Sequence, residues 1–271
     1  MSPRTAPPHR FVTSTDGVQI ATYELGDPAH PTVLLVHGFA SSAVANWYAT
    51  GWTRDLLRAG FHVIAIDQRG HGASDKPHSA SAYTMELLVA DVELVLDGYL
   101  ISEARYVGYS LGARVGWAAA RAFGARISQA VLGGIPDGDP LKRFQIADAR
   151  AHLEHGTEVT DHLTGVYLKM AKTLPGNDLA ALVALVEGMR GGPQPSADNA
   201  PAQPLLFATG SEDRILAASR SLAAAAPQAS FFEIPGRTHF NAPPSRAFRD
   251  AAVDSLRPAP LSSPSPELSH D

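Results

Sequence analysis

The segment from residue 104 to residue 123 constrains the fold of this chain more than any other. A short run typical of a strand ends in Gly108-x-Ser110-x-Gly112, and a helix-like segment follows at once. In a Gly-x-Ser-x-Gly turn of this kind, the chain passes sharply from a strand into a helix and the serine occupies the apex. The turn is tight, so its flanking positions must be small, as Gly108 and Gly112 are. We predict that the Ser110 hydroxyl stands clear of the backbone at a helix N-terminus, where negative charge is favoured.

Patterns typical of strands and helices alternate along the rest of the chain. Strand patterns lie at residues 10–14, 18–24, 32–36, 61–66, 104–109, 127–134, 204–208 and 230–234, and helix patterns at 47–60, 83–100, 111–123, 215–226 and 245–256. The dipeptide Asp16-Gly17 predicts a hairpin between the first two strands. The alternation predicts an α/β fold with a mostly parallel, eight-stranded sheet and helices on both faces. The hairpin adds an antiparallel pair at one edge.

One long segment breaks the alternation. Residues 141–198 show helical patterns and no strand pattern. We therefore divide the chain into a core of residues 10–136 and 204–256 and a helical cap insertion of residues 137–203. We expect the cap to lie over the carboxyl edge of the sheet, where ligands bind in such folds. Residues 1–9 are predicted to be a flexible tail, and the Pro- and Ser-rich residues 257–271 a disordered tail with no role in the fold.

Charge and composition exclude several classes of function. The 271-residue chain has a net charge of −5 and no basic run, so we expect neither a nucleic acid nor a membrane surface as partner. It has no cysteine, which excludes disulfides and thiolate metal sites. No stretch approaches the ~18 consecutive apolar residues of a membrane helix, and the first ten residues show no apolar signal segment. We therefore expect a cytoplasmic protein.

Four motifs occur in an order and spacing that indicate one family. They are His37-Gly38-Phe39, Asp67-x-Arg69-Gly70-His71-Gly72-x-Ser74, Gly108-Tyr109-Ser110-Leu111-Gly112 and Gly236-Arg237-Thr238-His239-Phe240. On these motifs the chain resembles the α/β-hydrolase fold superfamily from about residue 11 to residue 256, and within it the short-capped, carboxylesterase-like serine hydrolases. The resemblance implies the α/β-hydrolase fold with a small helical cap. It is much less specific for the substrate.

The chemistry of a nucleophilic serine agrees with this resemblance. A serine hydroxyl is a poor nucleophile unless a neighbouring base takes its proton, and a histidine base needs a carboxylate to fix its tautomer. In this fold the three residues follow in the order Ser, Asp or Glu, His. The motif positions therefore imply Ser110 as nucleophile, Asp213 as acid and His239 as base. Asp137 and Asp139, which follow the preceding strand, remain alternatives for the acid.

The resemblance also implies an oxyanion hole made of two backbone N–H groups. They belong to Phe39 and to Leu111, the residue after the nucleophile. We interpret His37 as a hydrogen-bonded structural histidine rather than a second base. We interpret the turn at residues 67–74 as a feature that fixes the loop beside the site, without a catalytic role. The implied chemistry needs neither a cofactor nor a metal ion, and we expect none.

The predicted activity is the hydrolysis of carboxylic esters through an acyl-enzyme on Ser110. Four side chains, Tyr109, Tyr167, Met170 and Met189, are predicted to line a largely apolar substrate pocket. A small apolar pocket favours short to medium acyl chains or a small lactone. The expected partner is therefore a small-molecule ester or lactone. The sheet edge or the cap could also support a homodimer.

Other activities share the same three residues and stay open at this point. They are those of an enol-lactonase, a carbon–carbon bond hydrolase and a cofactor-free perhydrolase. A carbon–carbon hydrolase would need a polar clamp for a second carboxylate, for which Arg143, Arg190 and Arg214 are candidates. The alternative of another class is a ligand-binding receptor that keeps an intact triad without turnover, because fold does not fix function.

Overall fold

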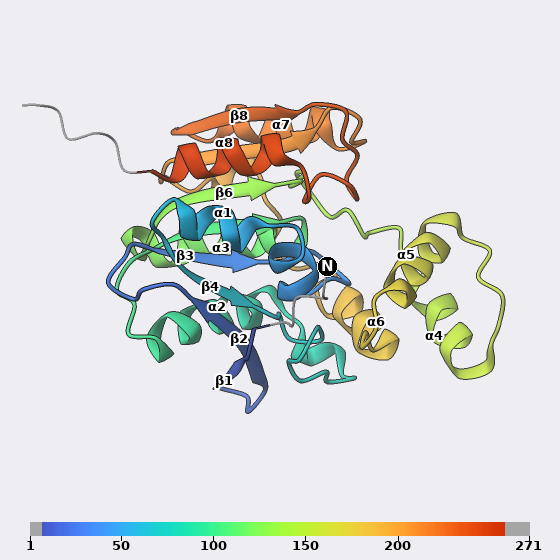
Figure 1. The fold of residues 1–271 in the computed structure, drawn as a ribbon. Helices are drawn as coiled ribbons and strands as arrows, with labels where there is room; N and C mark the ends of the chain where they lie inside the picture. The colour runs from blue at the N-terminus through green and yellow to red at the C-terminus, as the bar shows by residue number, and fades with distance from the viewer. Residues whose placement is uncertain (1–6, 258–271) are drawn as a thin grey trace, which may run out of the picture.

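An eight-stranded sheet forms the centre of the computed structural model, which describes residues 7–257 (Figure 1). Its strands are β1 (Arg10–Thr13), β2 (Gln19–Leu25), β3 (Thr32–Val36), β4 (His62–Ile66), β5 (Ala104–Tyr109), β6 (Ile127–Gly133), β7 (Leu205–Gly210) and β8 (Ala229–Ile234). Their order across the sheet is β1-β2-β4-β3-β5-β6-β7-β8. β2 pairs antiparallel with β1 and with β4, and every other pair is parallel. The predicted fold class is confirmed. The predicted tails fall largely outside the described residues.

The central strands are buried on both faces, as their unbroken apolar sequences predict. Every residue of β3 (TVLLV) and of β4 (HVIAI) is buried, whereas three of the four residues of the edge strand β1 are exposed. Parallel strands covered by helices on both sides need apolar side chains in both directions, which removes the alternating pattern of a half-exposed strand. These strands were therefore recognisable in the sequence as continuous apolar runs.

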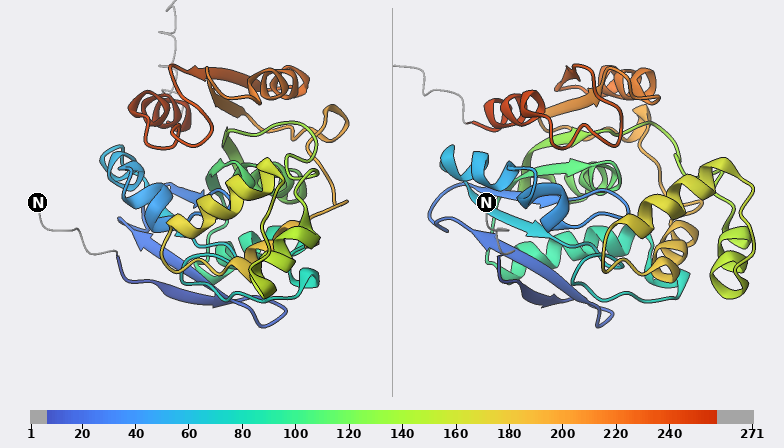
Figure 2. Two further views of the ribbon diagram at one scale, coloured as in Figure 1. Left: turned by 90° about the vertical axis from the view of Figure 1, so that its right-hand side faces the viewer. Right: turned by 45° about the vertical axis from the view of Figure 1, so that its right-hand side comes forward.

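Helices cover the two faces of the sheet in two groups (Figures 1 and 2). One face carries α1 (Trp52–Arg58) and α8 (Arg246–Leu256), and the other carries α2 (Met85–Gly98), α3 (Leu111–Phe123) and α7 (Leu216–Ala225). Trp52 and Phe248 join the first group, with their rings 4.8 Å apart in an edge-to-face arrangement. The two groups bury separate apolar cores on either side of the strands. This is the layered arrangement that alternating strands and helices predict.

The predicted helix over residues 47–60 is not continuous. The chain instead forms a π-helical turn, η1 (Val44–Tyr48), and then the shorter α1. Gly51 separates them with a φ of +89°, a left-handed conformation that glycine adopts without steric cost. A short turn and a glycine at this point start α1 in a new direction. The predicted boundaries of the remaining core helices differ from the observed ones by about two residues at most.

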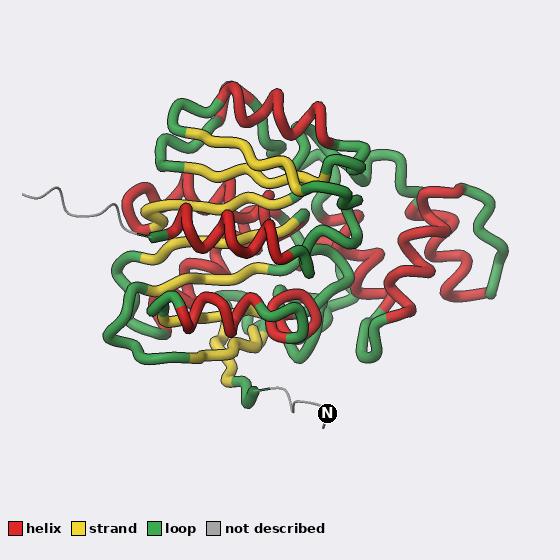
Figure 3. The backbone as a smooth tube through the Cα atoms, turned by 45° about the horizontal axis from the view of Figure 1, so that its top comes forward, coloured by secondary structure: helices red, strands yellow, loops and turns green. Residues whose placement is uncertain are grey.

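Residues 137–203 contain three α-helices and a short 3₁₀ turn rather than one continuous helical run. The helices are α4 (Ile146–His155), α5 (His162–Thr173) and α6 (Leu179–Gly188). Asp161 and Asp178 cap the N-termini of α5 and α6 by accepting backbone N–H groups. Gly156 ends α4 with a φ of +70°. Figure 3 shows these helices as a group set apart from the layer of strands.

The turn between β5 and α3 is a tight junction in the core. Ser110 has φ 53° and ψ −112°, a strained backbone for a residue with a side chain. A Cβ atom on Gly112 would lie 2.0 Å from the Val36 carbonyl oxygen, and one on Gly108 would lie 2.4 Å from the Gly112 carbonyl oxygen. Only glycine fits either position, as the motif predicts. The turn brings Ser110 beside the loop that follows β3.

The substitution Gly112→Ala is expected to destabilise the protein by roughly 3 kcal/mol, because neither backbone segment can move away from the added methyl group without disrupting β3 or β5. Urea denaturation measures this difference. Gly165→Ala is the matched control, since Gly165 also lies inside a helix and the nearest atom to its added Cβ is 4.0 Å away. That variant should gain up to about 1 kcal/mol. Equal stability of the two variants would contradict the close approach at Gly112.

Candidate active site

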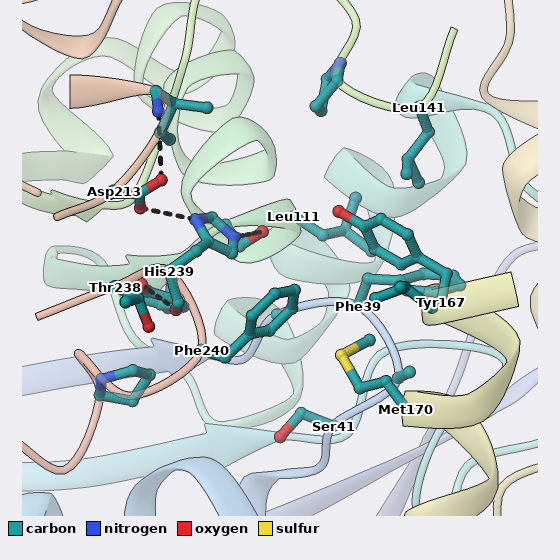
Figure 4. A pocket seen from close by; sticks show the side chains of 18 of the residues that line it. Phe39, Ser41, Leu111, Leu141, Tyr167, Met170, Asp213, Thr238, His239 and Phe240 are labelled. Carbon is teal, nitrogen blue, oxygen red and sulfur yellow. Dashed lines mark hydrogen bonds and ion pairs between the residues drawn. The ribbon is translucent and has the colours of Figure 1, made fainter. Parts of the chain in front are cut away.

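Three side chains from separate loops meet at the carboxyl edge of the sheet. His239 Nε2 lies 3.0 Å from Ser110 Oγ, and His239 Nδ1 lies 2.9 Å from Asp213 Oδ2 (Figure 4). Ser110 follows β5, Asp213 follows β7 and His239 follows β8. Neither Asp137 nor Asp139 bonds to His239 within the described part of the chain. The structure thus brings Asp213, rather than the two alternative carboxylates, to the histidine.

The surroundings of Asp213 fix the tautomer of His239. Asp213 is buried, and its Oδ1 accepts the backbone N–H of Ile215 at 3.1 Å. Its Oδ2 therefore remains to accept the proton on His239 Nδ1. In the neutral ring, this leaves Nε2 with a lone pair that faces the Ser110 hydroxyl. The three groups are arranged so that a proton can pass from the serine to the histidine.

A buried phenol anchors the backbone of the histidine loop. The Tyr109 hydroxyl donates to the His239 carbonyl at 2.6 Å. Tyr109 is the last residue of β5 and is 4% exposed, so its ring has little freedom to move. Asn241 accepts the backbone N–H of Thr238 at 2.8 Å on the other side of the histidine. The residue that precedes the nucleophile therefore also helps to position the base.

Two backbone N–H groups beside Ser110 have no acceptor among residues 7–257. They belong to Phe39, in the loop after β3, and to Leu111, the first residue of α3. Gly38 allows this loop to approach, since a Cβ atom there would lie 3.3 Å from Ser110 Cβ. Free donors next to a serine hydroxyl form the arrangement that stabilises a developing oxyanion. These are the two groups that the sequence motifs implied.

His71 holds the loop that carries Phe39. Its Nε2 accepts the backbone N–H of Ala40 at 3.0 Å, and its Nδ1 donates to the Arg69 carbonyl at 3.1 Å. Ala40 has a φ of 56°, which is uncommon for a residue with a side chain. A hydrogen bond to its N–H stabilises this conformation. His71 is fully buried, and burial together with the neighbouring His37 lowers its pKa to about 3.

His37 has a similar structural role. Its Nε2 accepts the backbone N–H of Gln68 at 3.1 Å, and its Nδ1 donates to the Gly38 carbonyl at 2.8 Å. Complete burial lowers the pKa of His37 below its ordinary value, although the Asp67 carboxylate partly opposes this shift. The ring is therefore neutral and engaged with the backbone, in agreement with the interpretation of His37 as structural.

The turn at residues 67–74 is fixed by buried charges. Asp67 accepts the backbone N–H groups of Ala43 at 2.6 Å and Ala73 at 2.8 Å. Arg69 is fully buried and forms ion pairs with Asp91 and Asp16, each at 2.7 Å. A fully paired arginine and a carboxylate satisfied by amides are stable in a low-dielectric interior. The turn thus supports the loop beside Ser110, and its charged side chains face their own partners.

A cavity of about 820 Å³ opens above Ser110 between the core and the cap. All four predicted pocket residues line it, namely Tyr109, Tyr167, Met170 and Met189. In Figure 4, Phe39, Tyr167, Met170 and Phe240 surround the space from the loop after β3, from α5 and from the loop after β8. The Phe240 ring is 58% exposed and lies 5.6 Å from the His239 ring. Much of the wall is therefore apolar, with the hydrogen-bonded groups on one side.

Two arginines of residues 7–257 line the cavity, and the less exposed of them, Arg114, was not predicted from the sequence. Arg114 is 5% exposed and lines the cavity. Of the three arginines considered as a clamp, Arg214 lines the cavity but is exposed, and Arg190 donates to the carbonyls of Leu141 and Phe144. Arg143 is not among the lining residues. The position of Arg114 one helical turn after Ser110 was the signal that could have identified it.

Residues 7–257 hold no group of three or more side chains that could bind a metal ion together. Within the same residues, no helix is both long enough and apolar enough to cross a membrane.

Part of the chain is similar in sequence to known hydrolases. Residues 31–150 match the family model of the alpha/beta hydrolase fold. Epoxide hydrolase A of Mycobacterium tuberculosis (strain ATCC 25618 / H37Rv) is 35% identical over 149 residues, which are 54% of this chain and 43% of that protein. The chain spans less than half the length of the first curated relatives it matches.

Solved structures share the whole architecture at lower identity. The enol-lactonase from Burkholderia xenovorans LB400 has a TM-score of 0.73 and 22% identity, and the match covers 91% of this chain and 99% of that one. Epoxide Hydrolase A from Mycobacterium thermoresistibile has a TM-score of 0.72 and 21% identity, covering 93% of this chain and 98% of that one. At these identities the likeness concerns the fold, and it confirms the α/β-hydrolase fold.

We expect the protein to lose stability as the pH falls below about 6.5, because His71 is held neutral in the folded state. Its folded pKa of about 3 lies below the unfolded value, so the unfolded chain binds more protons in between. The contribution of His71 to the free energy of unfolding should be complete above pH 6.5 and fall by roughly 5 kcal/mol by pH 3. Urea denaturation between pH 7.5 and pH 4 measures this slope.

The variant His71→Gln tests the assignment, since an amide oxygen can accept the Ala40 N–H but does not titrate. Its stability should fall less steeply with decreasing pH than that of the wild type. Part of the slope should remain because His37 is buried in the same way. His30→Gln, at an exposed position, is the control and should keep the wild-type slope. An unchanged slope in His71→Gln would contradict the assignment of a neutral, buried His71.

Proposed function

We propose that this member of the α/β-hydrolase fold superfamily is a serine hydrolase that cleaves carboxylic esters of short to medium acyl chain. The observation that carries the proposal is the chain of two hydrogen bonds from Asp213 through His239 to Ser110. It ends beside the two unoccupied N–H groups of Phe39 and Leu111. A base, a nucleophile and oriented donors within one small space are the parts that acyl transfer requires.

Acylation begins with attack of Ser110 Oγ on the ester carbonyl carbon. As the new C–O bond forms, the hydroxyl proton passes to His239 Nε2 and the carbonyl oxygen becomes an oxyanion. The N–H groups of Phe39 and Leu111 donate to this oxyanion. When the tetrahedral intermediate collapses, the bond to the alkoxide breaks and His239 gives its proton to the departing oxygen. The acyl group remains on Ser110 as an ester, and the alcohol leaves.

Deacylation repeats the steps with water as the nucleophile. Water attacks the acyl carbon while His239 Nε2 takes one of its protons, and the same two N–H groups stabilise the second oxyanion. Collapse releases the carboxylic acid and returns the proton to Ser110 Oγ. Asp213 stays ionised throughout and stabilises the imidazolium that forms in each step. Tyr109 holds the histidine backbone in place during all of these proton transfers.

The identity of the nucleophile argues against epoxide opening, although several relatives carry that name. A carboxylate that opens an epoxide forms an alkyl ester, whose carbonyl water can then attack. A serine hydroxyl that opened an epoxide would form an ether, which has no carbonyl for water to attack. Ser110 would therefore be consumed after one event. An ester substrate avoids this outcome because the acyl-enzyme is itself hydrolysable.

The cavity supports a substrate of limited size. Its volume of about 820 Å³ is typical of pockets for small molecules. Aromatic and aliphatic side chains of α5 and the loops line it, including Tyr167, Met170 and Phe240. A small-molecule ester or lactone is the partner that we propose. The enol-lactonase, carbon–carbon hydrolase and perhydrolase activities use the same groups and gain support together if the first experiment below shows a reactive Ser110 without ester turnover.

Steady-state hydrolysis of p-nitrophenyl esters from acetate to palmitate is expected to peak at short or medium chains and to vanish in Ser110→Ala, because the alanine has no nucleophile. Release of p-nitrophenol measures it, and labelling by a fluorophosphonate shows independently whether Ser110 is reactive. If Ser110 is labelled but no ester turns over, the lactone, carbon–carbon, perhydrolase and receptor alternatives gain support. Wild-type turnover in Ser110→Ala would contradict the whole site.

The variant Asp213→Asn is expected to lower kcat by about 10³- to 10⁴-fold, because an amide favours the wrong histidine tautomer while keeping the side-chain shape. The ester giving the highest rate in the previous experiment serves as substrate. Asp137→Asn is the matched control, since Asp137 is exposed and lies after the preceding strand. It should keep the wild-type rate. A large loss in the control with a normal rate in Asp213→Asn would reverse the assignment of the acid.

A further inference from the structure

We infer that Arg114 forms a carboxylate-binding subsite, so that the preferred substrate is an ester or lactone that carries a second, ionised carboxylate. This inference rests on the proposed function, since it concerns which ester the same cavity accepts. Arg114 lines the cavity that contains Ser110. The guanidinium is buried and lacks a carboxylate partner. Burial of such an unpaired charge destabilises the folded protein unless a ligand of opposite charge binds to it.

The helix places Arg114 at a fixed spacing from the nucleophile. Ser110 precedes α3, and Arg114 donates its backbone N–H to the Ser110 carbonyl at 3.1 Å. Residues four apart on a helix lie on the same face, with their Cα atoms ~6 Å apart along the axis. The arginine therefore lies on the same side of α3 as Ser110, about one helical turn further along the helix. A substrate whose carbonyl meets Ser110 would place a second group a few bonds away near this side chain.

The guanidinium of Arg114 is almost unpartnered. It is 5% exposed, and Nη2 is the one of its three nitrogens that donates a hydrogen bond within residues 7–257, to Gln194 Oε1. Its Nε is buried without an acceptor. No carboxylate of the described residues lies within 4.0 Å of it, whereas the buried Arg69 has two ion pairs and the buried Arg249 has one. Arg114 thus keeps donors that protein groups do not use.

The other charged groups on the cavity wall do not neutralise Arg114. Asp213 is bonded to His239, and Glu212 and Arg214 are exposed. Asp139 is the carboxylate close enough to favour the charged form, but its Oδ1 accepts the Leu141 N–H at 2.9 Å. Burial nevertheless lowers the pKa of Arg114 below its ordinary value, and the charge of Asp139 opposes this shift only in part. An arginine stays protonated at neutral pH, so a buried positive charge remains.

A carboxylate fits these features better than other anions. The planar guanidinium accepts a carboxylate with two parallel hydrogen bonds. A phosphate dianion would need a second cation, and on this wall the remaining arginine, Arg214, is exposed. Leu141, Leu185 and Met189 line the same cavity and suit the methylene groups of a chain that links the two ends. The substrate class is therefore a half-ester of an aliphatic dicarboxylic acid or a lactone of similar length.

A purely structural role for Arg114 makes a different prediction. Gln194 belongs to the segment that returns from the cap to the core, and Asn199 donates to its carbonyl at 2.8 Å. Loss of the hydrogen bond from Arg114 to Gln194 would loosen that segment and lower the rates with all substrates in proportion. A carboxylate subsite instead changes the ratio between charged and neutral substrates. The ratio is therefore the quantity to measure.

The experiment compares the monomethyl esters of glutarate, adipate and pimelate with the methyl esters of pentanoate, hexanoate and heptanoate, by acid release in a pH-stat. For one chain length, wild-type kcat/KM is expected to favour the half-ester by about 10- to 100-fold. Arg114→Gln should lower this ratio by about the same factor. Arg121→Gln is the matched control, because Arg121 is exposed on the same helix and its loss removes the same charge. Its ratio should equal that of the wild type.

Two results would overturn the inference: a wild type without preference for any half-ester, or an Arg114→Gln variant that keeps the preference. Equal loss with charged and neutral esters would indicate the structural role alone. If Arg114→Gln does not fold, Arg114→Lys replaces it; its ammonium cannot form the bidentate contact, so the ratio should fall several-fold. An unchanged ratio in that variant would also contradict the subsite.

A binding measurement separates this inference from the proposed function. Calorimetric titration of Ser110→Ala with the same half-esters should show binding that is lost in Ser110→Ala/Arg114→Gln. This result would support the subsite even if wild-type protein hydrolysed no ester, which would contradict the proposed function alone. Absence of binding in Ser110→Ala, or equal binding in both proteins, would overturn the subsite whatever the rates with neutral esters.

Discussion

The close approach of α3 to the end of β3 holds the candidate site together. Gly112 lies so near the Val36 carbonyl that no side chain fits between them. This contact sets both the position of Ser110 at the start of α3 and the path of the loop that carries Phe39. Donors that are fixed by backbone packing need no reorganisation when charge develops. The buried network around His71 and Asp67 supports the same loop, with the backbone N–H groups of Ala40 and Ala43 as its hydrogen-bond donors.

Local sequence was sufficient for the parts of the molecule whose conformation is decided locally. The parallel strands are recognisable because burial on both faces demands unbroken apolar runs, as in β3 and β4. The Gly-x-Ser-x-Gly turn is recognisable because its two glycines have no substitute. The placement of His239 near Ser110 then follows from chain order in this fold, although 129 residues separate them.

Other features of the fold and the site could not be predicted from the sequence. Gly51 divides one predicted helix into η1 and α1, yet an isolated glycine in a helical pattern is often tolerated. The sequence pattern around Arg114 is that of a surface arginine on an amphipathic helix. In the fold, Gln194, 80 residues later, forms a hydrogen bond with its guanidinium. Arg190 has the charged side chain that a carboxylate clamp requires, but its guanidinium donates to two backbone carbonyls of the cap. For both arginines, the tertiary partner decides the role of the residue.

The reacting groups and one part of the cavity wall belong to different parts of the chain. Asp213, His239 and Ser110 all stand on loops of the core, whereas α5 and α6 of the cap supply residues such as Tyr167 and Leu185 to the cavity. Substitutions in the two cap helices can therefore alter the range of accepted molecules without displacing the machinery that breaks the bond. Substrate selectivity can therefore change among related proteins while the reaction stays the same, because a mutation in the cap helices leaves Ser110, Asp213 and His239 in place.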